Sequence, residues 1–250
     1  MFIYLLKSTI CLTLLLGFYH LVLEREKMHR FNRYYLLSSI LFSFIIPSFI
    51  IYVTPNEIIE PVAIIQQNTV GEQVAFTPNS IEETASSMIN YNQLLIGSYI
   101  LISCLLLVRF SKNIFIIIKR IRRNQKINYF SATVVLLEEK VLPHTFWNYI
   151  FIDKTVYQSK QLEDQLLTHE LTHVKQRHTL DVLLIEVLQI LFWFNPLYIL
   201  LKKAVQLNHE FLADDAVISS HKNISEYQHL LLNKAAWNNN IYLASNLNYS

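Results

Sequence analysis

Long apolar stretches alternate with short polar ones along the first half of the chain. The stretches at about residues 2–23, 34–53 and 94–110 are rich in Leu, Ile and Phe, and each is long enough for a helix across a bilayer. No small-residue cleavage site of the kind that ends a signal peptide follows the first stretch, so we expect it to be retained. The pattern therefore predicts three transmembrane helices.

Shorter patterned segments follow in the second half. Residues 133–137 and 149–152 are rich in β-branched and aromatic side chains, which is typical of strands in a small sheet. Apolar positions at helical spacing then predict a helix over about 160–178, with Ser159 as its N-cap. The strand at 149–152 could offer a free edge to an extended peptide, or it could be plain sheet core.

The last apolar segment, residues 180–210, is interrupted by Asn195-Pro196. Proline cannot continue a helix and biases the preceding residue away from helical angles, so we expect the chain to reverse there. Each arm would be about 21 Å long at the rise of an α-helix, which is shorter than the hydrocarbon core of a bilayer. We therefore predict a re-entrant or partly embedded helical hairpin with Trp193 near its tip.

Composition agrees with a membrane protein, because 52% of the residues are hydrophobic, 16% are charged and only three are glycine. Cys11 and Cys104 lie inside apolar stretches and suggest neither a disulfide nor a thiolate metal site. Three polar residues interrupt the first arm of the hairpin, and we favour hydrogen bonding inside a packed hairpin over a direct functional role for them. They are Asp181, Glu186 and Gln189.

The placement of charge predicts the orientation in the membrane. Residues 24–33 carry four basic side chains and residues 112–126 carry six, whereas residues 54–91 carry five glutamates and no Lys or Arg. Basic loops remain in the cytoplasm, so 54–91 is expected to be an outer loop. The basic run at 112–126 is expected to anchor anionic lipid headgroups, and the net charge of +2 gives no case for nucleic-acid binding. We divide the chain into a membrane domain (1–126), a second domain (127–220) and a polar C-terminal segment (221–250).

The candidate chemistry centres on residues 169–173, His-Glu-Leu-Thr-His. Residues four apart share one face of a helix, so His169 and His173 can bind one metal ion, with Glu170 beside them and within reach of a water molecule. A catalytic zinc keeps three protein ligands and one open position, and Glu210 is our candidate for the third ligand. Asp214, four residues further on, could orient a ligand histidine. The alternative is a solvated helix that carries two histidines by chance.

These residues resemble the BlaR/MecR-type membrane zinc metallopeptidases, a family of bacterial sensor-transducers. The resemblance is strongest over residues 148–217, where three segments match in order and approximate spacing: 166–173, 192–197 and 210–214. It implies a mainly α, integral membrane protein with a gluzincin-like zinc peptidase domain on the cytoplasmic side of the bacterial inner membrane. It also implies one zinc per chain held by His169, His173 and Glu210, with Glu170 as the catalytic acid/base and Asp214 supporting a ligand.

The resemblance further implies a protein substrate, either a small helix-turn-helix repressor or the chain itself, and contact with membrane lipids. The chain has no extracellular penicillin-binding domain, so recognition of β-lactams is unsupported. It ends before the final span that many relatives carry, and we therefore expect a short or a truncated member. The signal and the oligomeric state stay open.

Two other functions, a receptor and a transporter, are alternatives to the peptidase. A metal-stabilised receptor without turnover would need the two histidines but not Glu170. A metal transporter would need ionisable residues along several spans, and the first three stretches carry almost none. Within the peptidase hypothesis, no residue stands out as the group that stabilises the oxyanion, and the candidates are His178, His209 and Tyr198.

Overall fold

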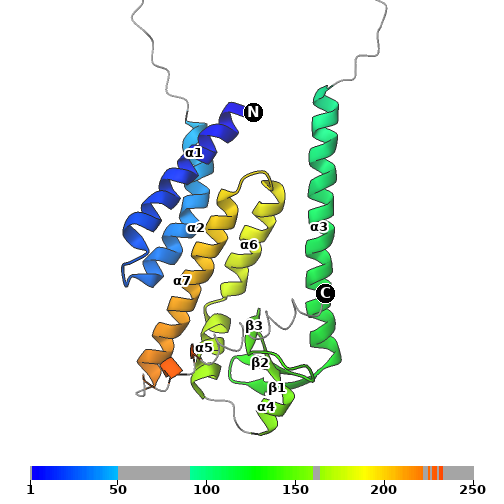
Figure 1. Ribbon diagram of the computed structural model, residues 1–250, viewed down its shortest axis with the longest axis vertical. Helices are drawn as coiled ribbons and strands as arrows, with labels where there is room; N and C mark the ends of the chain where they lie inside the picture. Colours follow the sequence, from blue (N-terminus) through cyan, green and yellow to red (C-terminus); the bar gives the residue numbers. More distant parts are fainter. Residues whose placement is uncertain are drawn as a thin grey trace, which may run out of the picture.

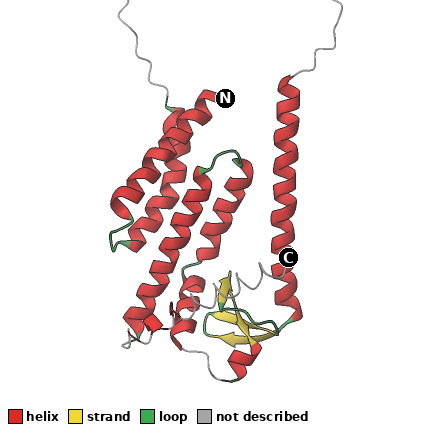
Figure 2. Ribbon diagram, viewed as in Figure 1, coloured by secondary structure: helices red, strands yellow, loops and turns green. Residues whose placement is uncertain are grey.

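The computed structural model describes residues 2–49, 91–159, 164–221, 225, 227–229 and 231–232. The protein is mainly helical, with one small sheet at one end (Figure 2). Among the described residues, two helical segments are long and apolar enough to cross a membrane, Ile3–Leu23 and Gln93–Arg123. The second expected span, at 34–53, runs into residues outside the described part, and so does the expected outer loop at 54–91. The three-span arrangement stays a prediction.

Four helices lie side by side and form the larger apolar core (Figure 1): α1 (Phe2–Phe18), α2 (His29–Ile45), α6 (His178–Leu191) and α7 (Leu197–Ser220). The core side chains include Leu12, Leu16, Tyr19, Leu36, Ile185 and Leu201, each at most 3% exposed. Helix α1 continues into a π-helical turn, η1 (Tyr19–Leu23), and α2 ends in a 3₁₀ turn, η2 (Ile46–Ser48). The bundle therefore joins the N-terminal helices to the hairpin.

Buried amides connect the helices of this bundle. The Asn32 side chain donates a hydrogen bond to the carbonyl of Leu23 at 2.9 Å, and the Asn208 side chain donates to the carbonyl of His29, also at 2.9 Å. Leu23 is the last residue of η1, where carbonyls lack a partner within the helix, and His29 is the first residue of α2. These two bonds fix the turn between α1 and α2 against α7.

Helix α3 (Tyr91–Arg123) stands apart from the bundle (Figure 1). None of its most apolar window is buried. In the first half of the helix, the Tyr99 hydroxyl donates to the carbonyl of Leu191 at 2.7 Å. Near the end of the helix, Ile117 and Ile121 pack against the sheet. The helix is longer than the expected span at 94–110, because the basic run that follows is helical too.

The sheet follows α3 and has the strand order β1-β2-β4-β3. Its strands are β1 (Gln125–Tyr129), β2 (Ala132–Leu137), β3 (His144–Phe146) and β4 (Tyr149–Asp153). Strands β2 and β4, which the sequence predicts, pair in parallel, and β1 and β3 add antiparallel at the edges. Of the two alternatives for the strand at 149–152, a free edge and plain sheet core, the structure supports sheet core, because β4 lies between β2 and β3.

A short helix, α4 (Lys154–Gln158), comes directly after the sheet. Asp153 is its N-cap and accepts a hydrogen bond from the Thr155 N–H at 2.7 Å. Ser159 is the C-cap residue of this helix, and its own N–H donates to the Thr155 carbonyl. The prediction that Ser159 is the N-cap of the helix over about 160–178 is therefore wrong.

The helix that carries His169 and His173 is α5 (Asp164–Lys175), and residues 160–163 before it lie outside the described part. Leu167 and Val174 bury one side of the helix against the sheet. Arg177 has left-handed backbone angles, with φ 54° and ψ 39°, and His178 begins α6. The predicted helix over 160–178 is thus wrong at its C-terminal end, because the chain bends at Arg177.

Helices α6 and α7 run antiparallel and are joined by residues 192–196. Asn195 accepts a hydrogen bond from the Leu197 N–H at 3.1 Å, and its side-chain amide donates to the Thr9 hydroxyl at 3.2 Å. Trp193 lies in this turn. The reversal predicted at Asn195-Pro196 is confirmed, and it brings α7 back beside α5. The depth of the hairpin in a membrane stays a prediction.

Acidic residues of the hairpin have partners inside the bundle. Glu186 on α6 pairs with Lys202 on α7 across the hairpin. Asp181, in the first turn of α6, pairs with Arg33 of α2 and His209 of α7. Hydrogen bonding inside a packed hairpin, the interpretation favoured from the sequence, is confirmed for these two residues.

Candidate metal centre

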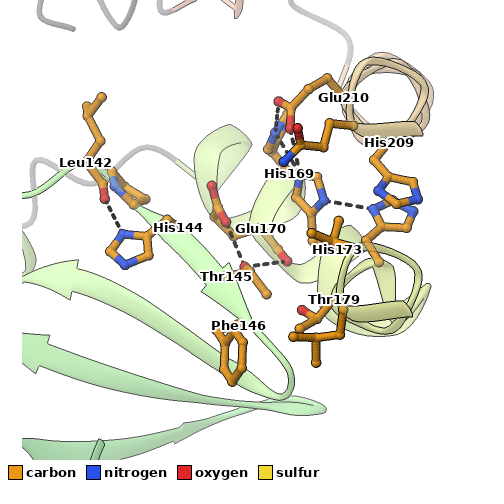
Figure 3. A pocket seen from close by; sticks show the side chains of 15 residues that line it. Leu142, His144, Thr145, Phe146, His169, Glu170, His173, Thr179, His209 and Glu210 are labelled. Carbon is orange, nitrogen blue, oxygen red and sulfur yellow. Dashed lines mark hydrogen bonds and ion pairs between the residues drawn. The ribbon is translucent and has the colours of Figure 1, made fainter. Parts of the chain in front are cut away.

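Helix α5 presents His169 and His173 from one face, and α7 presents Glu210 opposite them (Figure 3). The Nε2 atoms of the two histidines are 3.2 Å apart. Glu210 places Oε2 3.4 Å from His169 Nε2 and Oε1 3.7 Å from His173 Nε2. One ligand atom from each residue lies within 4.8 Å of the others. The structure therefore brings together the three residues that the sequence predicts as ligands. His169, His173 and Glu210 form the metal group.

The group faces an open cavity of about 460 Å³, whose walls come from β3, α5, α6 and α7. His169 is 2% exposed, whereas the Glu210 side chain is 54% exposed. Burial lowers the pKa of His173, and the opposing pull of the Glu170 carboxylate is smaller. A lowered pKa keeps that imidazole neutral at neutral pH, which is the form that binds a metal.

The side of His169 away from this group is held by a carboxylate and a phenol. His169 Nδ1 lies 3.1 Å from Asp214 Oδ1 and 2.9 Å from the Tyr227 hydroxyl, which itself donates to Asp214 Oδ1 at 2.7 Å. Burial, and next the hydrogen bond to Asp214, raise the pKa of Tyr227, so the phenol keeps its proton. Asp214 thus contacts the predicted ligand that it was expected to orient. Tyr227 carries no motif and was missed.

His173 is held on its far side by another histidine. His173 Nδ1 lies 2.8 Å from His178 Nδ1, and His178 Nε2 lies 3.1 Å from Gln176 Oε1. Burial, followed by the neighbouring charge of His209, lowers the pKa of His178 to about 2, so His178 is neutral. If His173 binds a metal through Nε2, its Nδ1–H donates to His178 Nδ1 and the His178 Nε2–H donates to Gln176.

Glu170 lies beside the metal group and is 4% exposed. The Thr145 hydroxyl of β3 lies 2.7 Å from Glu170 Oε2 and 3.2 Å from the Glu170 main-chain carbonyl (Figure 3). A hydroxyl has one proton, so the shorter contact is the stronger hydrogen bond. The edge strand therefore holds the Glu170 carboxylate at the wall of the cavity. Thr145 was missed because its strand has only three residues.

A family model described as BlaR1 peptidase M56 matches residues 4–248. The chain belongs to this family. The resemblance inferred from the sequence motifs is confirmed, and membership in the M56 family relates the protein to metallopeptidases. The family and the two apolar helices both suggest a membrane protein. No curated protein matches the sequence.

The donor set agrees with the metal that an M56 peptidase implies. Two imidazoles and one carboxylate converge, and such a set suits zinc with a position left open for substrate or water. Each imidazole also has a partner at its other nitrogen, as metal-bound histidines in proteins almost always do. The residues present therefore fit the group.

Two of the three residues considered as oxyanion stabilisers have other contacts, and the third lies elsewhere. His178 uses both ring nitrogens on His173 and Gln176, and His209 Nε2 bonds to Asp181 at 2.9 Å. Tyr198 is 2% exposed in the bundle core and does not line the cavity. The geometry selects none of the three.

Proposed function

We propose that this M56 protein is a membrane-embedded, zinc-dependent endopeptidase with a cytoplasmic active site. In this proposal it transduces a signal by cutting a transcriptional repressor or its own chain. The observation that supports it most is the convergence of His169, His173 and Glu210 within 4.8 Å beside the buried carboxylate of Glu170. A structural metal site needs ligands, but it does not need an acid held at the wall of an open cavity.

Each residue has a separate role in the proposed reaction. His169, His173 and Glu210 would hold one zinc ion, which when bound would polarise the scissile carbonyl and lower the pKa of a water molecule. Glu170 takes a proton from the attacking water and passes it to the departing amine. Thr145 keeps the Glu170 carboxylate in place for both transfers, because its hydroxyl donates to Oε2.

The substrate would bind as an extended peptide along β3. This strand lines the cavity and pairs with β4 on one side only among the described residues. An extended segment can add to such an edge through main-chain hydrogen bonds. The Thr145 contact to Glu170 places the strand next to the acid/base, so a peptide bound there would cross the metal group.

Two observations, the placement of charge and the hairpin, support the cytoplasmic location that we propose. The basic segments at 24–33 and 112–126 belong on the cytoplasmic side. Helices α5 and α7 meet at the end of the bundle opposite the hairpin turn (Figure 1). A cytoplasmic repressor of the small helix-turn-helix type is the substrate class that we propose, with anionic lipids around the basic end of α3.

The decisive experiment compares wild type with Glu170→Gln. We expect the variant to bind zinc as wild type does and to lose peptide cleavage by several orders of magnitude, because Gln cannot accept the proton of the attacking water. The readouts are zinc content and cleavage of a co-expressed repressor or of the chain itself. If wild type also cuts nothing while it binds zinc, a metal-stabilised receptor without turnover becomes the better description.

Thr145 offers a finer test of the same site. Thr145→Val removes the hydroxyl that donates to Glu170, whereas the matched control Thr145→Ser keeps it. We expect Val to lower kcat about tenfold with zinc affinity unchanged, and Ser to retain most of the rate, since one hydrogen bond to a charged group contributes about 1.5–3 kcal/mol. Equal rates for both variants would remove Thr145 from the mechanism.

Cysteine labelling tests the topology. Lys175 and Ser219 are exposed and lie near the site ends of α5 and α7. With Cys11 and Cys104 replaced, single cysteines at both positions should resist a membrane-impermeant reagent in intact cells and react after permeabilisation. Labelling of either cysteine from outside would contradict the cytoplasmic site.

A further inference from the structure

Helix α2 contacts the surroundings of the metal group through one arginine. Arg33 extends from α2 to the first turn of α6, where its Nε lies 2.7 Å from Asp181 Oδ2. Its Nη2 donates to the main-chain carbonyl of Gln176, between α5 and α6, at 2.8 Å. The Arg33 and Asp181 side chains are only 17% and 10% exposed. A planar guanidinium can form both bonds at once, whereas the single ammonium of lysine lacks this fork geometry.

From Asp181 the contacts lead to one predicted ligand. Asp181 Oδ2, the oxygen that accepts from Arg33, also lies 2.9 Å from His209 Nε2. His209 is 3% exposed and directly precedes Glu210 on α7. The position of the His209 ring therefore depends on a carboxylate that Arg33 holds, and Glu210 is attached to the same helical turn.

From Gln176 the contacts lead to another ligand. Its main-chain carbonyl accepts from Arg33, and its side-chain oxygen lies 3.1 Å from His178 Nε2. His178 in turn contacts His173 Nδ1 at 2.8 Å. The rings of His178 and His209 stack at 3.9 Å with an angle of 5°, so the two branches meet behind the metal group.

We propose that Arg33 is a positioning residue for the metal centre. It acts on His173 through Gln176 and His178, and on Glu210 through Asp181 and His209, so metal affinity depends on where α2 lies. This inference rests on the proposed function for the metal site and extends it to regulation: a displacement of α2 in the membrane changes the geometry of two ligands. Partners behind metal ligands commonly alter metal affinity by 10–100-fold.

The test measures zinc affinity of the full-length protein in detergent by competition with a chromophoric chelator. We expect Arg33→Met to weaken zinc binding about tenfold or more and Arg33→Lys to give an intermediate loss, because lysine restores the charge without the fork. Arg30→Met is the matched control: Arg30 is exposed on the same helix, and within the described part of the chain its side chain forms no hydrogen bond or ion pair. It should bind zinc as wild type does.

A second control separates positioning from stability. Lys202→Met breaks a different partly buried ion pair of the bundle, the one with Glu186, whose two residues do not line the cavity of the metal group. We expect it to lower the melting temperature, as Arg33→Met does, but to leave zinc affinity unchanged. Equal zinc affinities for Arg33→Met and Lys202→Met would show that Arg33 only fastens α2 to α6, and this would overturn the proposal.

Asp181→Asn provides an independent variant in case Arg33→Met does not fold. It removes the charge that Arg33 and His209 share, and we expect weaker zinc binding. In the double variant Arg33→Lys/Asp181→Asn the two losses should be less than additive, because both residues act through one contact. Full additivity would contradict the shared path. If wild type itself binds no zinc, the proposed function fails; if wild type binds zinc and Arg33→Lys and Asp181→Asn bind it equally well, only this inference fails.

Discussion

The Nδ1 atom of His169 is held from the C-terminal part of α7 and beyond it, whereas the Nδ1 atom of His173 is held from the start of α6. His169 Nδ1 meets the carboxylate of Asp214 on α7 and the hydroxyl of Tyr227. His173 Nδ1 meets the neutral ring of His178, the first residue of α6. The two histidines share one helix face, yet the charge behind them differs.

This difference affects the basicity of each predicted ligand. A hydrogen bond to an ionised acceptor is about twice as strong as one between neutral groups, and it raises the basicity of the imidazole. His169 is therefore the electrostatically supported ligand. His173 depends on geometry instead, because its neutral acceptor is itself fixed by Gln176 and by stacking on His209. Changes in the bundle should reach the site mainly through His173.

The largest expected effect on zinc binding comes from replacing a predicted ligand, which would make the different supports of His169 and His173 irrelevant. His169→Ala, His173→Ala and Glu210→Ala should each abolish stoichiometric zinc binding at micromolar metal, because two ligands do not suffice for a zinc site. Metal content of the purified variants by elemental analysis is the measurement. A Glu210→Ala protein with one zinc per chain would remove this residue from the ligand set.

Loss of the Asp214 carboxylate, which contacts His169 Nδ1, should cause the second-largest loss of zinc affinity. Asp214→Ala leaves the His169 Nδ1–H without its charged acceptor, and we expect zinc affinity to fall by about 100-fold, at the upper end for such partners. Asp215→Ala is the control, since Asp215 follows it in the chain but is exposed. Chelator competition compares the two. Equal affinities would show that Asp214 contributes nothing to the metal site.

Loss of the neutral acceptor behind His173 should cost less. His178→Phe keeps a ring to stack on His209 but cannot accept from His173 Nδ1–H, and we expect about a tenfold loss of zinc affinity. His144→Phe, on the exposed part of β3, serves as the control and should leave affinity unchanged. A loss for His178→Phe as large as that for Asp214→Ala would contradict the comparison drawn here.

Tyr227→Phe should have the smallest effect. The change removes one hydroxyl but leaves Asp214 in contact with His169, so we expect zinc affinity to fall only a few-fold, in line with about 0.5–1.5 kcal/mol for one hydrogen bond. The double variant Tyr227→Phe/Asp214→Ala should then resemble Asp214→Ala alone, because the tyrosine acts on the aspartate. Chelator competition measures both.

Local signals in the sequence predicted that His169 and His173 lie together and that the chain turns in the hairpin. His169 and His173 are four residues apart, and Asn195-Pro196 breaks a helix wherever it lies, so neither conclusion needs tertiary information. Arg33, Thr145 and Tyr227 are different. Their partners are 148, 25 and 58 residues away in the chain, and no short pattern marks such contacts.

The errors also have local causes. Ser159 fits the N-cap preference, but Asp153 already caps a helix of five residues that ends there. Helix α5 ends at Lys175, and Arg177, two residues later, has a left-handed conformation that is uncommon for residues other than glycine. Strand β3 has only three residues and β1 begins with polar ones, so neither segment shows the alternation of apolar and polar residues that predicts a strand. The choice between a free edge and sheet core for the strand at 149–152 stayed open because β3 was not recognised.

The separation between Arg33 and Asp181 also determines when the site can form during synthesis. Arg33 leaves the ribosome 148 residues before its partner, which at a typical rate of about 5–20 residues per second is an interval of roughly 7–30 seconds. Glu210 and Tyr227 follow later still. A nascent chain thus carries its two histidines before the groups that hold them, and the candidate metal site is complete only after the hairpin has brought Glu210 beside α5.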